Sequence, residues 1–209
     1  MTIAPCAFGG STSSHASGAT ESASVVADVQ PAFTSSQPII TILPGKTLSG
    51  GAVDLARKPG WRVIYFWGAN CPWVVACEKE CYIPLARKYA GKVSFYAVAT
   101  NSFDLQLSTV QLEQQVKQRH LPYSLILDPT HRIAINLQAR TTPQTFLLDP
   151  HNRVVWYGIP SDPSQRLFSP EPIPSKPPKT YLSVAIAQAL AGKPITPSPL
   201  KEAGCVVAW

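Results

Sequence analysis

The most hydrophobic run of the chain lies at residues 62–67, which read Arg-Val-Ile-Tyr-Phe-Trp without a polar residue after the arginine. β-Branched and aromatic residues in such a run, without alternation, are typical of a strand that is buried on both faces. Shorter runs of the same kind predict further strands at 39–43, 93–100, 123–127, 145–148 and 153–157. The turn at 149–152 joins the last two strands as a hairpin.

Helical signals fall between these strands. Pro72 suits the first position of a helix that runs to about residue 89, with a kink expected at Pro84. Ser108, followed three residues later by Gln111, has the pattern of a capping box and predicts a helix that ends near residue 120. A short helix at 133–137 and a last helix at 180–191, closed by Gly192, complete the set. The alternation predicts an α/β fold with a central mixed sheet flanked by helices.

Composition divides the 209 residues into three parts. Residues 1–36 are rich in Gly, Ser, Thr and Ala and have too little apolar surface to order themselves, so we expect a disordered leader. Residues 37–159 form the predicted core. Residues 160–209 contain a proline-rich crossing, the last helix and a tail that carries Cys205.

Charge and hydropathy exclude two classes of partner. The formal net charge is +6, but the basic residues are scattered and do not form a stripe, so we expect no binding to nucleic acid. The apolar stretches fall short of the roughly 20 residues that a membrane-spanning helix needs. We therefore expect any association with a membrane to occur at its surface.

The five cysteines are Cys6, Cys71, Cys77, Cys81 and Cys205, and no two of them have CxxC spacing. Without a cluster of Cys and His residues, a structural zinc site is not expected, and we predict neither a metal nor another cofactor. Cys6, which precedes a Gly/Ser-rich linker, resembles the start of a mature bacterial lipoprotein and is a candidate lipid anchor. The alternative is a leader with an incidental cysteine.

Cys71 is the strongest chemical candidate. It lies between the end of a buried strand and the start of a helix, where a thiolate is stabilised and reacts as a nucleophile. The alternative for this position is a buried, inert cysteine. Trp67, Pro72 and Trp73 surround it and are expected to shield the thiol from water and to offer a surface to a partner chain.

Residues 66–72, Phe-Trp-Gly-Ala-Asn-Cys-Pro, resemble the active-site signature of thioredoxin-like proteins of the TlpA/redoxin (AhpC/TSA-like) type. Thr142-Pro143 resembles the cis-proline loop of that fold, and the terminal Gly-Cys is similar to the C-terminus of one redoxin subgroup. The resemblance implies a thioredoxin-like fold over roughly residues 37–205. It also implies that Thr142 and Pro143 hold a partner peptide in extended form beside the nucleophile.

The chain departs from the family pattern at Val74, where the second cysteine of the usual pair would stand. A mixed disulfide on Cys71 therefore needs another resolving thiol. Cys77 lies on a different side of the helix, and Cys81 lies almost three turns along it. Cys205, on the tail, can fold back over the site, and we favour it. A monothiol mechanism or the absence of a redox role are the other possibilities.

The same residues bear on two other activities that occur on related folds. Copper-delivery proteins of the Sco kind use a CxxxC pair and a histidine, which makes Cys77 and Cys81 with His120 or His131 a candidate copper site. Buried packing is the commoner role for such cysteines. Peroxiredoxins need Thr or Ser three residues before the attacking cysteine, and Gly68 stands there, so peroxidase activity is not expected.

The sequence thus favours a thiol-disulfide oxidoreductase that acts on a protein dithiol or disulfide partner through Cys71 and Cys205. We expect it in an extracytoplasmic compartment, in the periplasm or at a membrane surface. The competing hypothesis is a non-catalytic thioredoxin-like accessory subunit of a membrane-bound complex, because a fold that has lost its second cysteine can be retained for its surface alone.

Overall fold

The structure is a computed structural model that describes residues 39–161 and 180–207. The expected leader 1–36, the candidate lipid anchor Cys6 and most of the proline-rich crossing lie outside the described residues.

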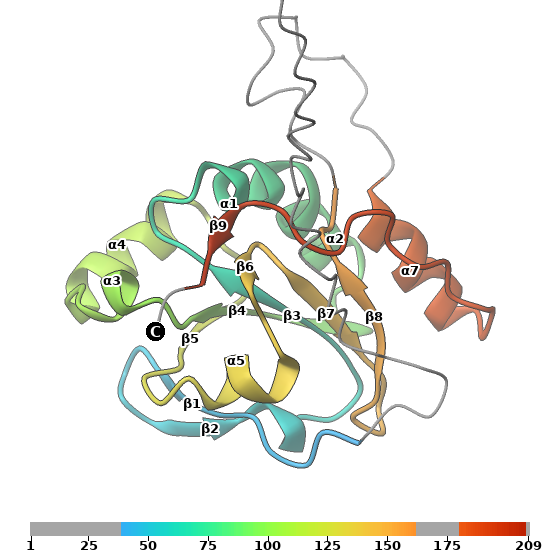
Figure 1. The fold of residues 1–209 in the computed structure, drawn as a ribbon, viewed down its shortest axis with the longest axis horizontal. Helices are drawn as coiled ribbons and strands as arrows, with labels where there is room; N and C mark the ends of the chain where they lie inside the picture. The colour runs from blue at the N-terminus through green and yellow to red at the C-terminus, as the bar shows by residue number, and fades with distance from the viewer. Residues whose placement is uncertain (1–38, 162–179, 208–209) are drawn as a thin grey trace, which may run out of the picture. The chain divides into compact units, whose positions relative to one another are not determined.

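A seven-stranded mixed sheet forms the centre of the fold, in the order β2-β1-β5-β4-β3-β7-β8 (Figure 1). β3 pairs parallel with β4, and β4 with β5, whereas the remaining neighbours are antiparallel. The predicted α/β class and mixed sheet are thereby confirmed. The strands are β1 (Pro44–Thr47), β2 (Ala52–Asp54), β3 (Trp61–Trp67), β4 (Val93–Ala99), β5 (Ser124–Leu127), β7 (Thr145–Leu148) and β8 (Val154–Gly158).

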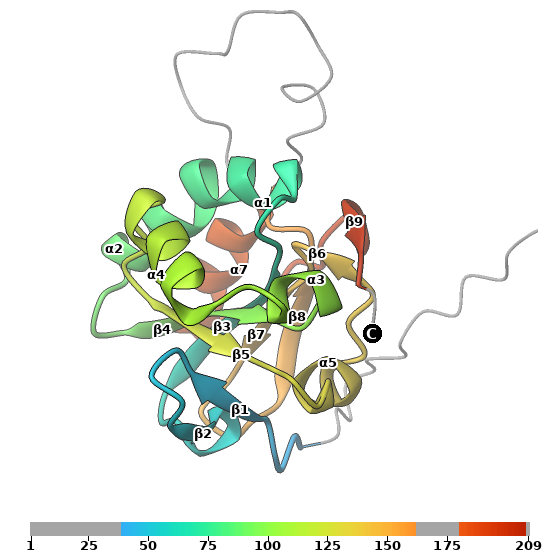
Figure 2. The same ribbon diagram turned by 90° about the vertical axis from the view of Figure 1, so that its left-hand side faces the viewer.

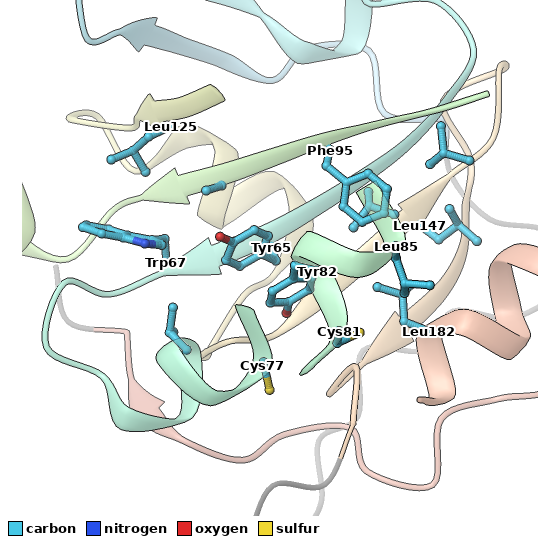
Figure 3. Packing of buried hydrophobic residues seen from close by; sticks show 14 of the residues in the cluster. Tyr65, Trp67, Cys77, Cys81, Tyr82, Leu85, Phe95, Leu125, Leu147 and Leu182 are labelled. Atoms are coloured by element: carbon cyan, nitrogen blue, oxygen red, sulfur yellow. The ribbon is translucent and has the colours of Figure 1, made fainter. Parts of the chain in front are cut away.

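Helices cover both faces of the sheet (Figure 2). One face packs against α1 (Pro72–Cys77), α2 (Ile83–Lys88), α4 (Thr109–Gln118) and α7 (Tyr181–Leu190), and the other against α5 (Arg132–Leu137) and the chain that surrounds β1 and β2. Alternate side chains of β3 enter the two cores, as expected for a central strand. Figure 3 shows the first of these cores, in which Cys77 and Cys81 lie among aromatic and aliphatic side chains.

Arg62 is the one charged residue of strand β3, and its side chain is fully buried. Its guanidinium donates hydrogen bonds to the carbonyl oxygens of Gly60, Leu55 and Asp149. These carbonyl oxygens partly compensate the buried positive charge. Burial nevertheless lowers the pKa of Arg62.

A second, two-stranded sheet lies beside the end of β3. It pairs β6 (Thr141–Thr142) with β9 (Cys205–Val206) in antiparallel fashion, so that Thr142 is opposite Cys205. The figures show β9 next to β6 and near the start of α1 (Figures 1 and 2). The C-terminal tail therefore crosses the end of the sheet at which Cys71 lies.

One predicted strand is wrong, and one predicted helix differs in detail. Residues 39–43 do not form a strand, because the sheet begins at Pro44 and the amide of Leu43 is instead bonded to the Asp54 side chain. The helix after Cys71 runs to Lys88, as predicted, but its irregularity is a π-helical turn at Glu78–Tyr82 that precedes Pro84. The capping box of Ser108 and Gln111 and the closing position of Gly192 are confirmed.

Candidate functional site

Cys71 lies at the turn between β3 and α1, as predicted. It is the residue that precedes the first turn of α1, and Pro72 takes the first helical position, where a missing amide hydrogen costs nothing. The Cys71 side chain is buried, with 4% of its surface exposed. Its thiol donates a long hydrogen bond of 3.5 Å to the carbonyl oxygen of Thr142.

Two charged side chains hold the loop that leads to Cys71. The Asp104 carboxylate accepts a 2.9 Å hydrogen bond from the Ala69 amide, and Arg119 donates to the Ala69 carbonyl. Asp104 belongs to α3 (Ser102–Leu105), a short helix that the sequence did not predict. Burial raises the pKa of Asp104, an effect that its hydrogen bonds partly oppose.

Beneath the loop, Glu78 is buried in a fully hydrogen-bonded network. Its carboxylate accepts 3.0 Å hydrogen bonds from the Tyr65 hydroxyl and the Trp67 indole and forms a 3.0 Å ion pair with Arg119. The Arg119 guanidinium also lies over the Trp67 ring, 5.0 Å from its centroid. Burial raises the pKa of Glu78, although Arg119 opposes that rise. Arg119 therefore connects Glu78, in the π-helical turn, with Ala69, in the loop that leads to Cys71.

The loop opposite Cys71 contains the peptide bond between Thr142 and Pro143, which is cis, as expected. The Tyr82 hydroxyl lies 3.1 Å from the Pro143 carbonyl and 2.5 Å from the Thr145 hydroxyl. The π-helical turn thus places Tyr82 under the cis-proline loop. This contact connects the helix that carries Cys71 to the strand that faces it.

The tail brings Cys205 to Cys71. The Cys205 thiol donates a hydrogen bond to the Cys71 sulfur at an Sγ–Sγ distance of 2.8 Å, across 134 residues of sequence. Backbone contacts hold this arrangement, because Cys205 pairs with Thr142 and the Val207 amide donates a 2.8 Å hydrogen bond to the Arg140 carbonyl. Both cysteines are free thiols. The structure therefore brings together the two residues that the sequence selected as attacking and resolving thiols.

The two thiols differ in environment. Burial, together with the hydrogen bond to Cys71 and the charge that Cys71 carries when ionised, raises the pKa of Cys205 to about 11. Cys205 is nevertheless the more exposed of the pair, whereas Cys71 is covered. At neutral pH Cys205 is thus a protonated thiol that donates to its neighbour.

Two glycines allow the tail to approach this closely. Gly204 has a φ of +113°, and a Cβ there would overlap the carbonyl oxygen of Thr142. Gly158, with a φ of +146°, lies against the tail further back, where a Cβ would come 2.6 Å from the Leu200 carbonyl oxygen. The same Leu200 carbonyl accepts a 2.8 Å hydrogen bond from the Ile159 amide. Both positions therefore require glycine, because a Cβ would overlap a backbone carbonyl oxygen and the positive φ disfavours other residues.

A pocket of about 310 Å³ opens beside the two sulfurs. Its walls are the loop 68–71, the segment 101–104 and the tail residues Cys205 and Val206. Phe103 and Val206 are largely exposed at this place, so the surface next to the thiols is apolar.

The other predicted site residues are placed differently. Cys77 and Cys81 are fully buried in the core, and burial raises the pKa of both thiols, that of Cys81 to about 12. Trp67 has no exposed surface, so the prediction that it contacts a partner is wrong. Its indole N–H instead donates a hydrogen bond to the Glu78 carboxylate. Pro72 is exposed and Trp73 is half-buried beside Cys71.

The candidate copper site does not assemble. Within residues 39–161 and 180–207, no three side chains of His, Cys, Asp or Glu are grouped so that they could hold a metal ion. His131 instead contacts the Thr100 hydroxyl at 3.1 Å.

The sequence did not reveal the roles that four residues have in shaping the site: Glu78, Asp104, Arg119 and Gly204. The first three are ordinary charged residues in helical segments, and nothing in their spacing indicates that they meet. Gly204 had a usable signal, because a glycine next to a functional cysteine often marks a close backbone approach.

Several solved structures share the overall fold of this chain. Among solved structures, a hypothetical protein from Sinorhizobium meliloti 1021 is similar at 21% identity and a TM-score of 0.71, covering 83% of this chain and 93% of that chain. An uncharacterised conserved protein from Geobacillus kaustophilus is similar at 23% identity and a TM-score of 0.67, covering 82% and 92%. A thioredoxin-like protein from Aeropyrum pernix reaches 15% identity and a TM-score of 0.50, covering 58% and 83%. A search of curated proteins found no match.

The likeness to the thioredoxin-like protein from Aeropyrum pernix identifies the fold as thioredoxin-like. In the part of the chain that the structure describes, no helix has the length and apolar character needed to span a bilayer. The family model described as AhpC/TSA matches residues 27–157, which is more than half of the sequence. The chain therefore belongs to the AhpC/TSA family.

Proposed function

We propose that the protein catalyses thiol-disulfide exchange with protein disulfides, with Cys71 as the attacking thiol and Cys205 as the resolving thiol. The observation that carries the proposal is the Sγ–Sγ distance of 2.8 Å between two free thiols that are 134 residues apart in sequence. A missing CxxC motif no longer argues against a dithiol cycle, because the tail supplies the second thiol.

In the first step Cys71 loses its proton to solvent, and its thiolate attacks one sulfur of the partner disulfide. The partner's S–S bond breaks as the Cys71–partner bond forms. The released sulfur leaves as a thiolate and takes a proton from water. The product is a mixed disulfide on Cys71, with one partner thiol already free.

In the second step Cys205 loses its proton and attacks the Cys71 sulfur. The Cys71–partner bond breaks as the Cys71–Cys205 disulfide forms, and the second partner sulfur leaves as a thiolate that takes a proton from water. The sum of both steps transfers two electrons from the Cys71–Cys205 dithiol to the partner. The reverse sequence oxidises a partner dithiol, and the redox potential of the partner decides the direction.

The environment of Cys205 fits this order. One reason for its raised pKa is the ionised form of Cys71, which is absent once Cys71 is bound in a neutral mixed disulfide. Cys205 is therefore a poor nucleophile before the first step and a better one after it. Cys77 and Cys81 do not compete, because burial keeps both protonated at neutral pH.

The proposed partner is a protein in an oxidising, extracytoplasmic compartment, where disulfides persist. Support for a protein partner comes from the Thr142 edge, which here is paired with an extended strand. The compartment follows from the proposed activity, because the partner disulfides that it needs persist in oxidising environments.

Single-cysteine variants test the proposal. Cys71→Ser should abolish reduction of a protein disulfide substrate such as insulin, whereas Cys205→Ser should accumulate a mixed disulfide between Cys71 and substrate. Cys77→Ser is the matched control, because it removes a thiol of the same helix that faces the core, and it should keep the exchange rate. Unchanged turnover in Cys71→Ser would refute the mechanism, and the lack of a trapped species in Cys205→Ser would refute the role of the tail.

A further inference from the structure

The Thr142 edge beside Cys71 is already occupied by the chain itself. Within the described residues, β6 pairs in its sheet with β9 alone, and Cys205 stands opposite Thr142. The Thr142 hydroxyl donates a 3.4 Å hydrogen bond to the Cys205 carbonyl. With the tail in this position, only 4% of the Cys71 surface is exposed. A second protein segment therefore cannot pair with Thr142 and reach Cys71 until the tail has left.

The tail also shows what kind of segment this edge accepts. The residue before its cysteine lies against the Thr142 carbonyl, where a Cβ would overlap the oxygen and would also lie 3.3 Å from Cδ of Pro143. The obstacles are backbone and ring atoms, which cannot rotate away as a flexible side chain can. The residue after the cysteine is Val206, whose side chain is 75% exposed, so this position selects little. Glycine immediately before the reacting cysteine is thus the one strong requirement.

We propose that the Thr141–Pro143 edge binds an extended partner segment in which glycine immediately precedes the reacting cysteine, and that residues 204–207 of the chain compete for this edge. The inference rests on the proposed exchange activity of Cys71. Partner binding and tail docking then exclude each other, and the return of the tail displaces the partner strand as Cys205 resolves the mixed disulfide.

The test uses the full chain with Cys205→Ser, which keeps the tail strand but removes its thiol. The probes are two peptides, Lys-Glu-Ala-Gly-Cys-Val-Val, which copies residues 201–207, and Lys-Glu-Ala-Ala-Cys-Val-Val. Each cysteine is activated as a mixed disulfide with 5-thio-2-nitrobenzoate. Attack by Cys71 transfers the peptide to Cys71 and releases the coloured thiolate, so absorbance gives the second-order rate constant. A Cys71→Ser/Cys205→Ser chain provides the blank for the other thiols.

Adding Gly204→Ala to Cys205→Ser should expel the tail and raise the rate with the Gly-Cys peptide at least tenfold. In this opened protein the Gly-Cys peptide should react at least fivefold faster than the Ala-Cys peptide. Gly192→Ala is the matched control, because Gly192 also has a positive φ but a Cβ there meets nothing within 4 Å. It should leave both rates unchanged. If Gly204→Ala does not fold, Val207→Pro opens the tail by removing the hydrogen bond to the Arg140 carbonyl.

Equal rates for the two peptides, or no acceleration in the opened protein, would overturn this inference while leaving the exchange activity intact. If Cys71 reacts with neither peptide nor with the small disulfide 5,5′-dithiobis(2-nitrobenzoate), the proposed exchange activity itself has failed. That small reagent has no strand to dock, so its rate reports the thiol alone.

Discussion

Arg119 and Glu78 form an ion pair, with 3.0 Å between Nη1 and Oε2, in which the side chains are only 12% and 2% exposed. The same arginine donates to the Ala69 carbonyl in the loop that carries Cys71. One buried charge pair thus connects the end of α4, the π-helical turn and the active-site loop.

Glu78→Gln should destabilise the fold by about 3 kcal/mol, because it leaves the Arg119 charge buried without a counter-ion. The double variant Glu78→Gln/Arg119→Gln should cost less than the sum of the two single variants, by about 1 kcal/mol or more. Urea denaturation of the four proteins measures this coupling. Costs that add to within about 0.5 kcal/mol would mean that the pair does not act as a unit.

The pH dependence of stability should carry a contribution from Asp104, whose pKa burial raises above the ordinary value of 3.8. Between pH 3.8 and the raised pKa, the Asp104 carboxyl is more often protonated in the folded protein than in the unfolded chain. The free energy of unfolding therefore falls as pH rises through this window. The stabilisation is fully present below pH 3.8 and is lost above the raised pKa.

Asp104→Asn keeps an oxygen that accepts from the Ala69 amide but removes the titration. Its unfolding free energy, measured in urea from acid to neutral pH, should vary less steeply than that of the parent protein. Glu78 and Asp128 titrate with raised pKa values in both proteins, so the difference between the two curves isolates Asp104. Parallel curves would contradict the assignment.

Removal of Cys71 should make Cys205 more acidic. Burial makes the largest contribution to the raised pKa of Cys205, which is about 11. The hydrogen bond to Cys71 and the charge of ionised Cys71 raise it further. Cys71→Ala removes the last two contributions, so the midpoint of Cys205 alkylation should move below pH 11. Mass spectrometry of iodoacetamide adducts over a pH series follows each thiol separately. A midpoint that stays in place would mean that Cys71 does not control the resolving thiol.

Gly158→Ala should detach the tail at its other contact. A φ of +146°, which residues with a side chain rarely adopt, costs an alanine about 1–3 kcal/mol, and overlap with residues 198–200 adds about 1–3 kcal/mol. The tail strand β9 pairs through two residues, whereas β8 pairs with β7 through four residues of the central sheet. We therefore expect the tail to yield and the alkylation rate of Cys71 to rise. Gly192→Ala, which meets no atom within 4 Å, should leave that rate unchanged. An equal rate in both variants would exclude this anchoring role.

The sequence was sufficient for the parts of the fold that depend on local patterns. The uninterrupted apolar run predicted β3, the capping box predicted α4, and Cys-Pro after a strand located Cys71. The sequence was not sufficient where the structure of a segment depends on contacts with residues that are distant in sequence. The two-residue strands β6 and β9 have no pattern of their own and exist because they pair. The network of Glu78, Asp104 and Arg119 likewise depends on packing between separate helices. Cys205 was found by elimination among the cysteines, whereas its contact with Thr142 is tertiary.

The most direct test of the account is to equilibrate the wild-type chain in glutathione redox buffers and to map its disulfides by mass spectrometry. The account predicts that Cys71 and Cys205 of the same chain form the first disulfide to appear as the buffer becomes more oxidising, while Cys77 and Cys81 remain thiols. A Cys71 that stays unlinked, or that pairs with any cysteine other than Cys205, would contradict it.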